Sequence, residues 1–258
     1  MCASTVKSTD SILLFDVPWE AYEGLIDALP DHRVPHTYQE GTLELFKTVW
    51  IDVPWEAYEE ILKAFGNRRF PHTYQDGTLE IMMSPSEDHE QIKSLMGRLI
   101  EVACLELKIH FKAVGAATRR NKKLMQGLEP DESYYIPYAP DLSSKIKRET
   151  EKKSPPNLAI EIDLRKLAVA RMKTYAKLGI RELWRYRKRK VEFFGLSGMG
   201  KYEPLKSSII FPMIGPDDVA RFIGEMQVSD DYVATQSFLA WLKKQITKSA
   251  ASIHKKES

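Results

Sequence analysis

Hydrophobic residues recur at helical spacing in five stretches after residue 50 and at strand spacing between them. The helical stretches are 53–65, 85–107, 165–178, 216–225 and 232–246. Short apolar runs predict strands at 77–82, 110–114, 132–137, 158–164, 182–186 and 191–194. A charged stretch rich in Ser and Pro, 139–156, predicts a loop. This order predicts an α/β fold in which helices cover a mixed sheet.

Local signals place two of the helix ends. Ser84-Pro-Ser-Glu87 has the pattern of a capping box with Pro85 at the first helical position, so we expect that helix to start at Pro85. Gly179 follows the stretch 165–178, where a glycine commonly ends a helix.

The N-terminal third of the chain contains a tandem repeat. Asp16–Phe46 and Asp52–Met82 align without a gap at an offset of 36, and 19 of 31 positions are identical. Each copy predicts a helix, a loop and a strand, and two copies are too few for a solenoid. The repeat is either a recognition or dimerisation arm, or a tandem duplication that adds a redundant helix and strand. Either copy could dock on the same groove, and the displaced copy would then pack outside it or on the partner of a homodimer.

Composition narrows the class of protein. The chain has 38 Lys and Arg against 36 Asp and Glu, a formal net charge of +2, which excludes a strongly basic coat protein and an acidic disordered chain. Two cysteines, Cys2 and Cys104, provide neither a disulfide framework nor a cysteine metal site. The apolar run Ile12–Phe15 is too short for a signal peptide or a membrane span. We therefore expect a soluble, cytoplasmic protein without a membrane partner.

The strand at 158–164 carries two acids. Alternation sends Ile160 and Ile162 to one face and Glu161 and Asp163 to the other. Two neighbouring carboxylates on a half-buried strand repel each other unless a cation or basic groups compensate them. The strand therefore predicts either a cation site or a strand end whose acids face solvent or pair with Lys and Arg.

Asp131 is the natural companion of these acids, because it leads directly into the strand at 132–137. Asp141 also follows a proline, but the residues after it do not resemble a strand. Two or three carboxylates from neighbouring strands, together with a substrate phosphate, make an adequate site for Mg²⁺ or Mn²⁺. The candidate ligands are Asp131, Glu161 and Asp163.

Two further features carry weaker signals. His89 lies on the apolar side of its helix and is either a packed core residue or a site residue, and the six histidines form no H-x-x-x-H pair that would indicate a zinc hydrolase. The segment 184–190 combines two aromatic residues with five cations, Arg185, Arg187, Lys188, Arg189 and Lys190. It is either an edge that contacts nucleic-acid phosphates or a charged hairpin turn that protects a sheet edge.

Four segments in order carry a resemblance to a known family: Gly77–His89, Gly127–Ile136, Pro156–Asp163 and Tyr175–Tyr186. They resemble the Uma-two family of bacterial restriction endonucleases, within the restriction-endonuclease-like, PD-(D/E)XK superfamily. The resemblance covers roughly residues 51–225 and implies a mixed sheet flanked by helices. It also implies that the second repeat copy belongs to the nuclease domain. The implied domains are an extra copy at 1–50, the nuclease domain at 51–227, and a C-terminal helix with a basic tail at 228–258.

The resemblance implies a Mg²⁺-dependent endonuclease that hydrolyses DNA, with Asp131 and Glu161 as metal ligands and His89 as a further site residue. The superfamily usually has lysine two residues after the strand glutamate, and here that residue is Asp163, which would add a ligand or orient water. Where much of the family has a lysine on the following helix, this chain has Arg171, with Lys173 nearby, and the resemblance implies that Arg171 or Lys173 contacts the phosphate. Arginine can hold the scissile phosphate but stays protonated and cannot act as a base.

Two alternatives stay open at this point. One is a catalytically degenerate member of the same fold that binds DNA without cutting it. The other is a homodimeric interaction scaffold in which the duplicated arm is the functional part. Mg²⁺-dependent nicking of DNA distinguishes the enzyme from both alternatives.

Overall fold

The computed structural model describes residues 12–14, 19–20, 22–23, 36–40, 42–45, 49–50, 53–65, 72–81, 86–136, 155–163, 171–226 and 228–254. The predicted loop residues 139–154 and the predicted helix residues 165–170 lie outside these ranges. The chain divides into two compact units. Unit 1 comprises residues 1–85, 118–129 and 167–174, and unit 2 comprises residues 86–117, 130–166 and 175–258. Within the described residues, no helix is long and apolar enough to cross a membrane.

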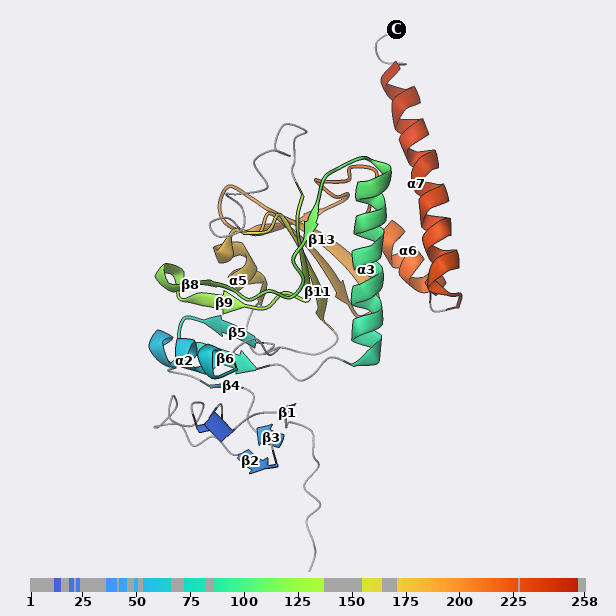
Figure 1. Ribbon diagram of the computed structural model, residues 1–258. Helices are drawn as coiled ribbons and strands as arrows, with labels where there is room; N and C mark the ends of the chain where they lie inside the picture. The colour runs from blue at the N-terminus through green and yellow to red at the C-terminus, as the bar shows by residue number, and fades with distance from the viewer. Residues whose placement is uncertain are drawn as a thin grey trace, which may run out of the picture. The chain divides into compact units, whose positions relative to one another are not determined.

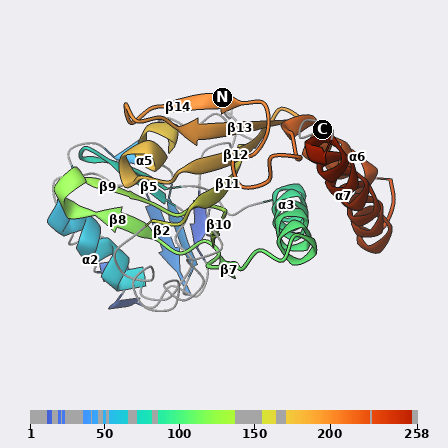
Figure 2. The same ribbon diagram turned by 90° about the horizontal axis from the view of Figure 1, so that it is seen from above.

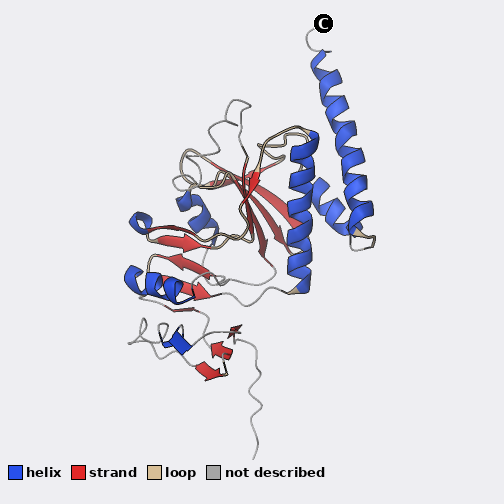
Figure 3. Cartoon of the chain, viewed as in Figure 1, coloured by secondary structure: helices blue, strands red, loops and turns tan. Residues whose placement is uncertain are grey.

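Unit 2 is built on a six-stranded sheet (Figures 1 and 3). Its strand order is β14-β13-β12-β11-β10-β7 (Figure 2). Its strands are β7 (Lys112–Ala113), β10 (Glu132–Tyr135), β11 (Leu158–Asp163), β12 (Glu182–Arg187), β13 (Lys190–Leu196) and β14 (Tyr202–Leu205). The pair β11–β12 is parallel and the other pairs are antiparallel, so the sheet is mixed, as predicted. Only β14 was not predicted.

Three helices pack together in unit 2: α3 (Glu87–Glu106), α6 (Pro216–Met226) and α7 (Asp231–His254). Figure 2 shows them gathered beside the sheet. Side chains from the helices, such as Leu99 and Phe222, share one core cluster with Ile160 and Ile162 of β11. The hydrophobic positions of β11 therefore face these helices, and its acids belong to the alternate positions.

The start of α3 differs from the prediction. The helix begins at Glu87 rather than Pro85, and its N-cap is Ser86, whose hydroxyl accepts a hydrogen bond from the His89 N–H at 3.3 Å. Ser84 matches the capping box, with Glu87 three residues later, whereas the residue three after Ser86 is His89 rather than Glu or Gln. The prediction chose the wrong serine, because a cap is defined by the hydroxyl that satisfies an N–H of the first turn.

Unit 1 contains a five-stranded antiparallel sheet with the order β4-β6-β5-β9-β8. Its elements are β4 (Val49–Trp50), α2 (Trp55–Phe65), β5 (His72–Gln75), β6 (Thr78–Ile81), β8 (Arg119–Asn121), the short 3₁₀ helix η1 (Lys122–Leu124) and β9 (Gln126–Leu128). Helix α2 packs its apolar face on the β5–β6 hairpin, with the Tyr58 and Tyr74 rings stacked at 4.5 Å. The hairpin β8–β9 and the strands β4 and β5 were not predicted, and the prediction of a loop between the helix and the strand of the second copy was wrong at β5.

The first repeat copy contributes a three-stranded sheet to unit 1, with the order β1-β3-β2. These strands are β1 (Ile12–Leu14), β2 (His36–Gln39) and β3 (Thr42–Leu45). Their register matches that of β4, β6 and β5 at an offset of 36: Leu13 pairs with Glu44 as Val49 pairs with Glu80. Tyr22 stacks on Tyr38 at 4.5 Å, as Tyr58 stacks on Tyr74. The similarity therefore extends to β1, which precedes the aligned segment.

Candidate active site

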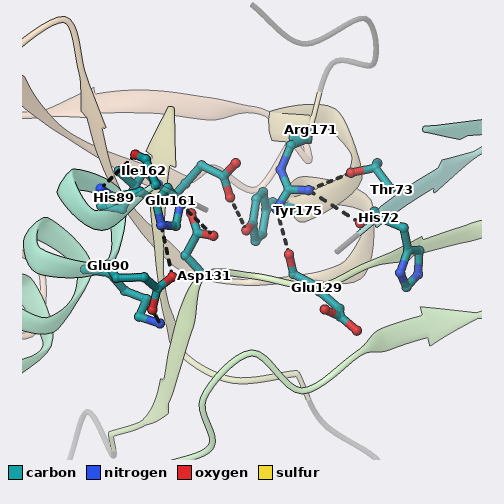
Figure 4. A network of polar contacts seen from close by, with 12 residues as sticks. His72, Thr73, His89, Glu90, Glu129, Asp131, Glu161, Ile162, Arg171 and Tyr175 are labelled. Carbon is teal, nitrogen blue, oxygen red and sulfur yellow. Dashed lines mark hydrogen bonds and ion pairs between the residues drawn. The ribbon is translucent and has the colours of Figure 1, made fainter. Parts of the chain in front are cut away.

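Strand β11 places Glu161 inside unit 2, near the middle of the six-stranded sheet. The Glu161 residue is 5% exposed, and its Oε2 accepts a hydrogen bond of 2.6 Å from the hydroxyl of the fully buried Tyr175 (Figure 4). Tyr175 comes from the C-terminal part of helix α5 (Arg171–Leu178). A hydroxyl that donates to a buried carboxylate holds it in one orientation and satisfies one of its oxygens.

Asp131 lies immediately before β10, beside the middle of β11. Glu132 pairs with Ile160, and the Ile162 N–H donates to Asp131 Oδ2 at 2.7 Å. The two acids of the candidate metal site thus come from β11 and from the residue that leads into its neighbour β10 (Figure 4). The backbone fixes the orientation of Asp131, as the Tyr175 hydroxyl fixes that of Glu161.

His89 stands in the first turn of α3, between two carboxylates. Its Nε2 lies 3.2 Å from Asp131 Oδ1, and its Nδ1 lies 3.2 Å from Glu90 Oε1. Burial by itself would lower the pKa of His89, but the hydrogen bond and charge of Asp131, followed by those of Glu90, raise it above the usual value. His89 is thus part of a polar cluster rather than of the apolar core, and the cluster favours its protonated form.

Asp163, the third candidate ligand, has a basic partner. Its Oδ2 lies 3.1 Å from Nε of Arg187, which is its register neighbour on β12. Its Oδ1 is buried and has no hydrogen-bond partner within the described residues. Asp163 therefore follows the alternative in which an acid of this strand pairs with a basic residue. Within the described residues, its Oδ1 still lacks a hydrogen-bond donor.

The described residues contain no group of three or more His, Cys, Asp or Glu side chains arranged to hold a metal ion. The donors at hand are the carboxylates of Asp131 and Glu161, together with the orphaned Oδ1 of Asp163. Mg²⁺ is often bound by one or two carboxylates, with water and substrate phosphate as its other ligands. The chemistry of this donor set therefore fits Mg²⁺.

Arg171 and Lys173 open helix α5 and belong to unit 1. The Arg171 residue is 4% exposed and donates from Nη1 to Thr73 Oγ1 and from Nη2 to the Glu129 carbonyl oxygen, both at 2.7 Å. The guanidinium thus ties α5 to β5 and to the residue that follows β9. Lys173 is exposed.

Sequence reasoning missed two of these roles. The buried bonds of Arg171 and the bond from Tyr175 to Glu161 were not predicted. A signal was present, because Arg171 and Tyr175 lie four residues apart and both follow the apolar register of the predicted helix. A cation on the buried face of a helix needs acceptors inside the protein.

The basic segment 184–190 forms the β12–β13 hairpin. Arg185 donates from Nε and Nη2 to Glu192 Oε2, and Arg187 pairs with Asp163. Lys188 and Arg189 form the two-residue turn, both with positive φ, and are exposed together with the following residue, Lys190. Two of the five cations are therefore engaged by acids within the sheet, and three are available to solvent.

Comparisons with known proteins identify a family for this chain. A family model named Uma2 and described as "Putative restriction endonuclease" matches residues 55–210, a range that begins with the second repeat copy. A comparison with curated proteins found no match. Among solved structures, the chain is similar to one described as "Crystal structure of a putative nuclease belonging to DUF820 from Anabaena variabilis ATCC 29413". It is 16% identical, the match covers 63% of this chain and 98% of that chain, and the TM-score is 0.44.

Proposed function

The chain belongs to the Uma2 family, and on that premise we propose that it is a Mg²⁺-dependent endonuclease that hydrolyses phosphodiester bonds of DNA. The observation that supports this proposal best is the pair of acids in unit 2. Asp131 and Glu161 come from neighbouring strands, and each has one oxygen held by a specific donor, the Ile162 N–H and the Tyr175 hydroxyl. Such preorganised carboxylates suit a hard cation and a substrate phosphate.

In this proposal Asp131 and Glu161 would hold the cation, and Asp163, two residues further along β11, is the third candidate ligand. A cation bound there would supply Lewis-acid chemistry: it would lower the pKa of an attacking water and neutralise charge that develops on the phosphate. Tyr175 and the Ile162 N–H keep the two carboxylates in place.

The predicted phosphate contacts stay part of the proposal. Lys173 is exposed and can reach a phosphate in solvent. Arg171 already donates to Thr73 and Glu129, so a contact with phosphate would compete with those bonds. We therefore favour Lys173 over Arg171 for this role.

Nicking of supercoiled plasmid DNA, with Mg²⁺ and with EDTA, tests the proposal. Asp131→Asn and Glu161→Gln preserve shape but remove the charge that binds a hard cation, so each should abolish Mg²⁺-dependent nicking. Glu192→Gln is the matched control, because its carboxylate pairs with Arg185 in the same sheet and is not proposed as a ligand. Wild-type nicking rates in the Asp131→Asn and Glu161→Gln variants would contradict the proposal.

A second candidate is a protein that binds DNA without cutting it. Asp163 occupies the position at which the superfamily usually has lysine, and it is paired with Arg187. The exposed turn formed by Lys188, Arg189 and Lys190 offers sequence-independent contacts with phosphate. A salt-sensitive gel shift without Mg²⁺-dependent nicking would favour this candidate.

A further inference from the structure

The first repeat copy reproduces the part of the second copy that binds the β8–β9 hairpin. In the second copy, β5 pairs with β9 through Thr73 with Leu128, Tyr74 with Gly127 and Gln75 with Gln126. In the first copy, the equivalent strand β2 has the same sequence, His-Thr-Tyr-Gln, and is an edge strand of its sheet within the described residues. One hairpin thus has two candidate strands with the same sequence in unit 1.

Side-chain contacts from β8–β9 and the start of α5 reach five positions of the second copy. Lys122 pairs with Glu56 at 2.9 Å and Arg120 with Glu59 at 3.5 Å. Arg171 donates to Thr73, Thr174 donates to Gln75 at 3.1 Å, and Gln126 donates to Asp76 at 3.0 Å. The equivalent residues of the first copy are Glu20, Glu23, Thr37, Gln39 and Glu40. Four of the five acceptors are identical, and the fifth keeps its carboxylate.

The shape of the hairpin also suits both copies. A Cβ atom at Gly127 would lie 2.2 Å from the hydroxyl of Tyr58, so β9 has a glycine where the stacked Tyr58 ring comes closest. Tyr22 and Tyr38 form the same stack in the first copy, at 4.5 Å and 18°, against 4.5 Å and 12° for Tyr58 and Tyr74. The ring arrangement that fits over Gly127 is therefore present twice.

We propose that the first copy is a second docking surface for the β8–β9 hairpin, and that the hairpin of the same chain exchanges between the two copies. A tethered hairpin has a far higher effective concentration than that of a second molecule, which favours the same chain as its source. The exchange conserves the strand pairing and the four identical acceptors, so the two states differ mainly in chain connectivity.

The length of the connecting chain favours docking of the hairpin on the second copy, as in the structure. The segment between the docked sheet and α3 is residues 82–86 when the second copy is docked and residues 46–86 when the first copy is docked. The segment lengthens about eightfold, and each doubling of a loop disfavours closure about threefold, so the exchanged state should be roughly 20-fold less populated. The exchanged state is therefore a minor state that a disulfide between introduced cysteines can capture.

Cysteine pairs trap each state, in a chain whose Cys2 is replaced by serine. Gln75→Cys with Gln126→Cys reports the observed pairing, and Gln39→Cys with Gln126→Cys reports the exchanged pairing. Thr42→Cys with Gln126→Cys is the matched control, because Thr42 lies on β3, one strand further from the docking edge. Disulfides are assigned by peptide mass spectrometry and non-reducing gels under slow oxidation.

We expect the 39–126 disulfide to form within single chains, about 20-fold more slowly than the 75–126 disulfide and well above the control. Formation no faster than the control would overturn the proposal, and so would 39–126 disulfides found only between two chains.

A second pair of variants tests the direction of the exchange. Thr73→Val removes the hydroxyl that accepts from Arg171 in the second copy only, so it should raise the 39–126 disulfide relative to the 75–126 disulfide about tenfold. Thr37→Val, the equivalent change in the first copy, should lower that ratio by a similar factor. An equal ratio in both variants would show that the copies do not compete for Arg171 and would overturn the exchange.

Discussion

The hydrogen bond from Tyr175 to Glu161 makes a quantitative prediction about the proposed site. Tyr175→Phe removes only the hydroxyl, and with it the hydrogen bond to the carboxylate of Glu161, a residue that is 5% exposed. A hydrogen bond to a charged group contributes about 1.5–3 kcal/mol, against about 1 kcal/mol for a neutral pair. We therefore expect Tyr175→Phe to lower the free energy of unfolding by about 2 kcal/mol and the melting temperature by about 4–8 °C.

Two comparison variants isolate the contribution of the Glu161 charge to this hydrogen bond. Tyr202 donates to the neutral carbonyl oxygen of Ile180 at 2.7 Å, so Tyr202→Phe should cost only about 1 kcal/mol. In the Glu161→Gln chain the acceptor is neutral, and Tyr175→Phe should again cost about 1 kcal/mol. Urea unfolding in EDTA, followed by circular dichroism, measures all these differences. If Tyr175→Phe costs no more than Tyr202→Phe, or costs the same with and without Glu161→Gln, the reasoning about a buried charged acceptor is refuted.

Three further predictions concern other parts of the molecule. Arg171→Ala should lower the free energy of unfolding by about 3 kcal/mol. Arg171→Lys should recover less than half of this loss, because lysine cannot donate to Thr73 and Glu129 from two nitrogens. Full recovery of the unfolding free energy in Arg171→Lys, measured by urea unfolding, would contradict this. Replacing the exposed residues 188–190 by alanine should weaken DNA binding and flatten its salt dependence in fluorescence anisotropy, whereas the same loss of charge on α7 should do so much less. The α7 control replaces Lys243, Lys244 and Lys248. Burial raises the pKa of the Glu182 carboxyl, so the folded chain binds the carboxyl proton more tightly than the unfolded chain does. The free energy of unfolding should therefore fall as pH rises from about 4.5 through the raised pKa. The stability difference between wild type and Glu182→Gln, measured across that range, should show this fall, and a flat difference would exclude it.

Local patterns were sufficient to predict the main elements of unit 2. The apolar run of β11 and the Pro-Asp step before β10 predicted the strands that carry Glu161 and Asp131, and the Gly179 signal marked the end of α5, where its φ is +83°. These signals lie within a few residues of the features that they predict. Strand pairing then brings the two acids to neighbouring strands.

Interactions between distant residues were not predictable in the same way. The β8–β9 hairpin has neither alternation nor a long apolar run, and its pairing with β5 joins residues about fifty positions apart. Arg171 was interpreted as a phosphate contact because it stands where much of the family has a lysine, and its acceptors, Thr73 and Glu129, lie far from it in the sequence. His89 posed a similar problem, because only the folded chain places Asp131 beside its ring.

The central claim is that Asp131 and Glu161 together bind a divalent cation. The most direct measurement is anomalous diffraction from crystals of the full chain soaked in Mn²⁺, which substitutes for Mg²⁺ and scatters anomalously. We expect an anomalous peak in contact with carboxylate oxygens of both Asp131 and Glu161, and its loss in Glu161→Gln crystals. Crystals that bind Mn²⁺ only elsewhere, or show no peak at these two acids, would contradict the claim.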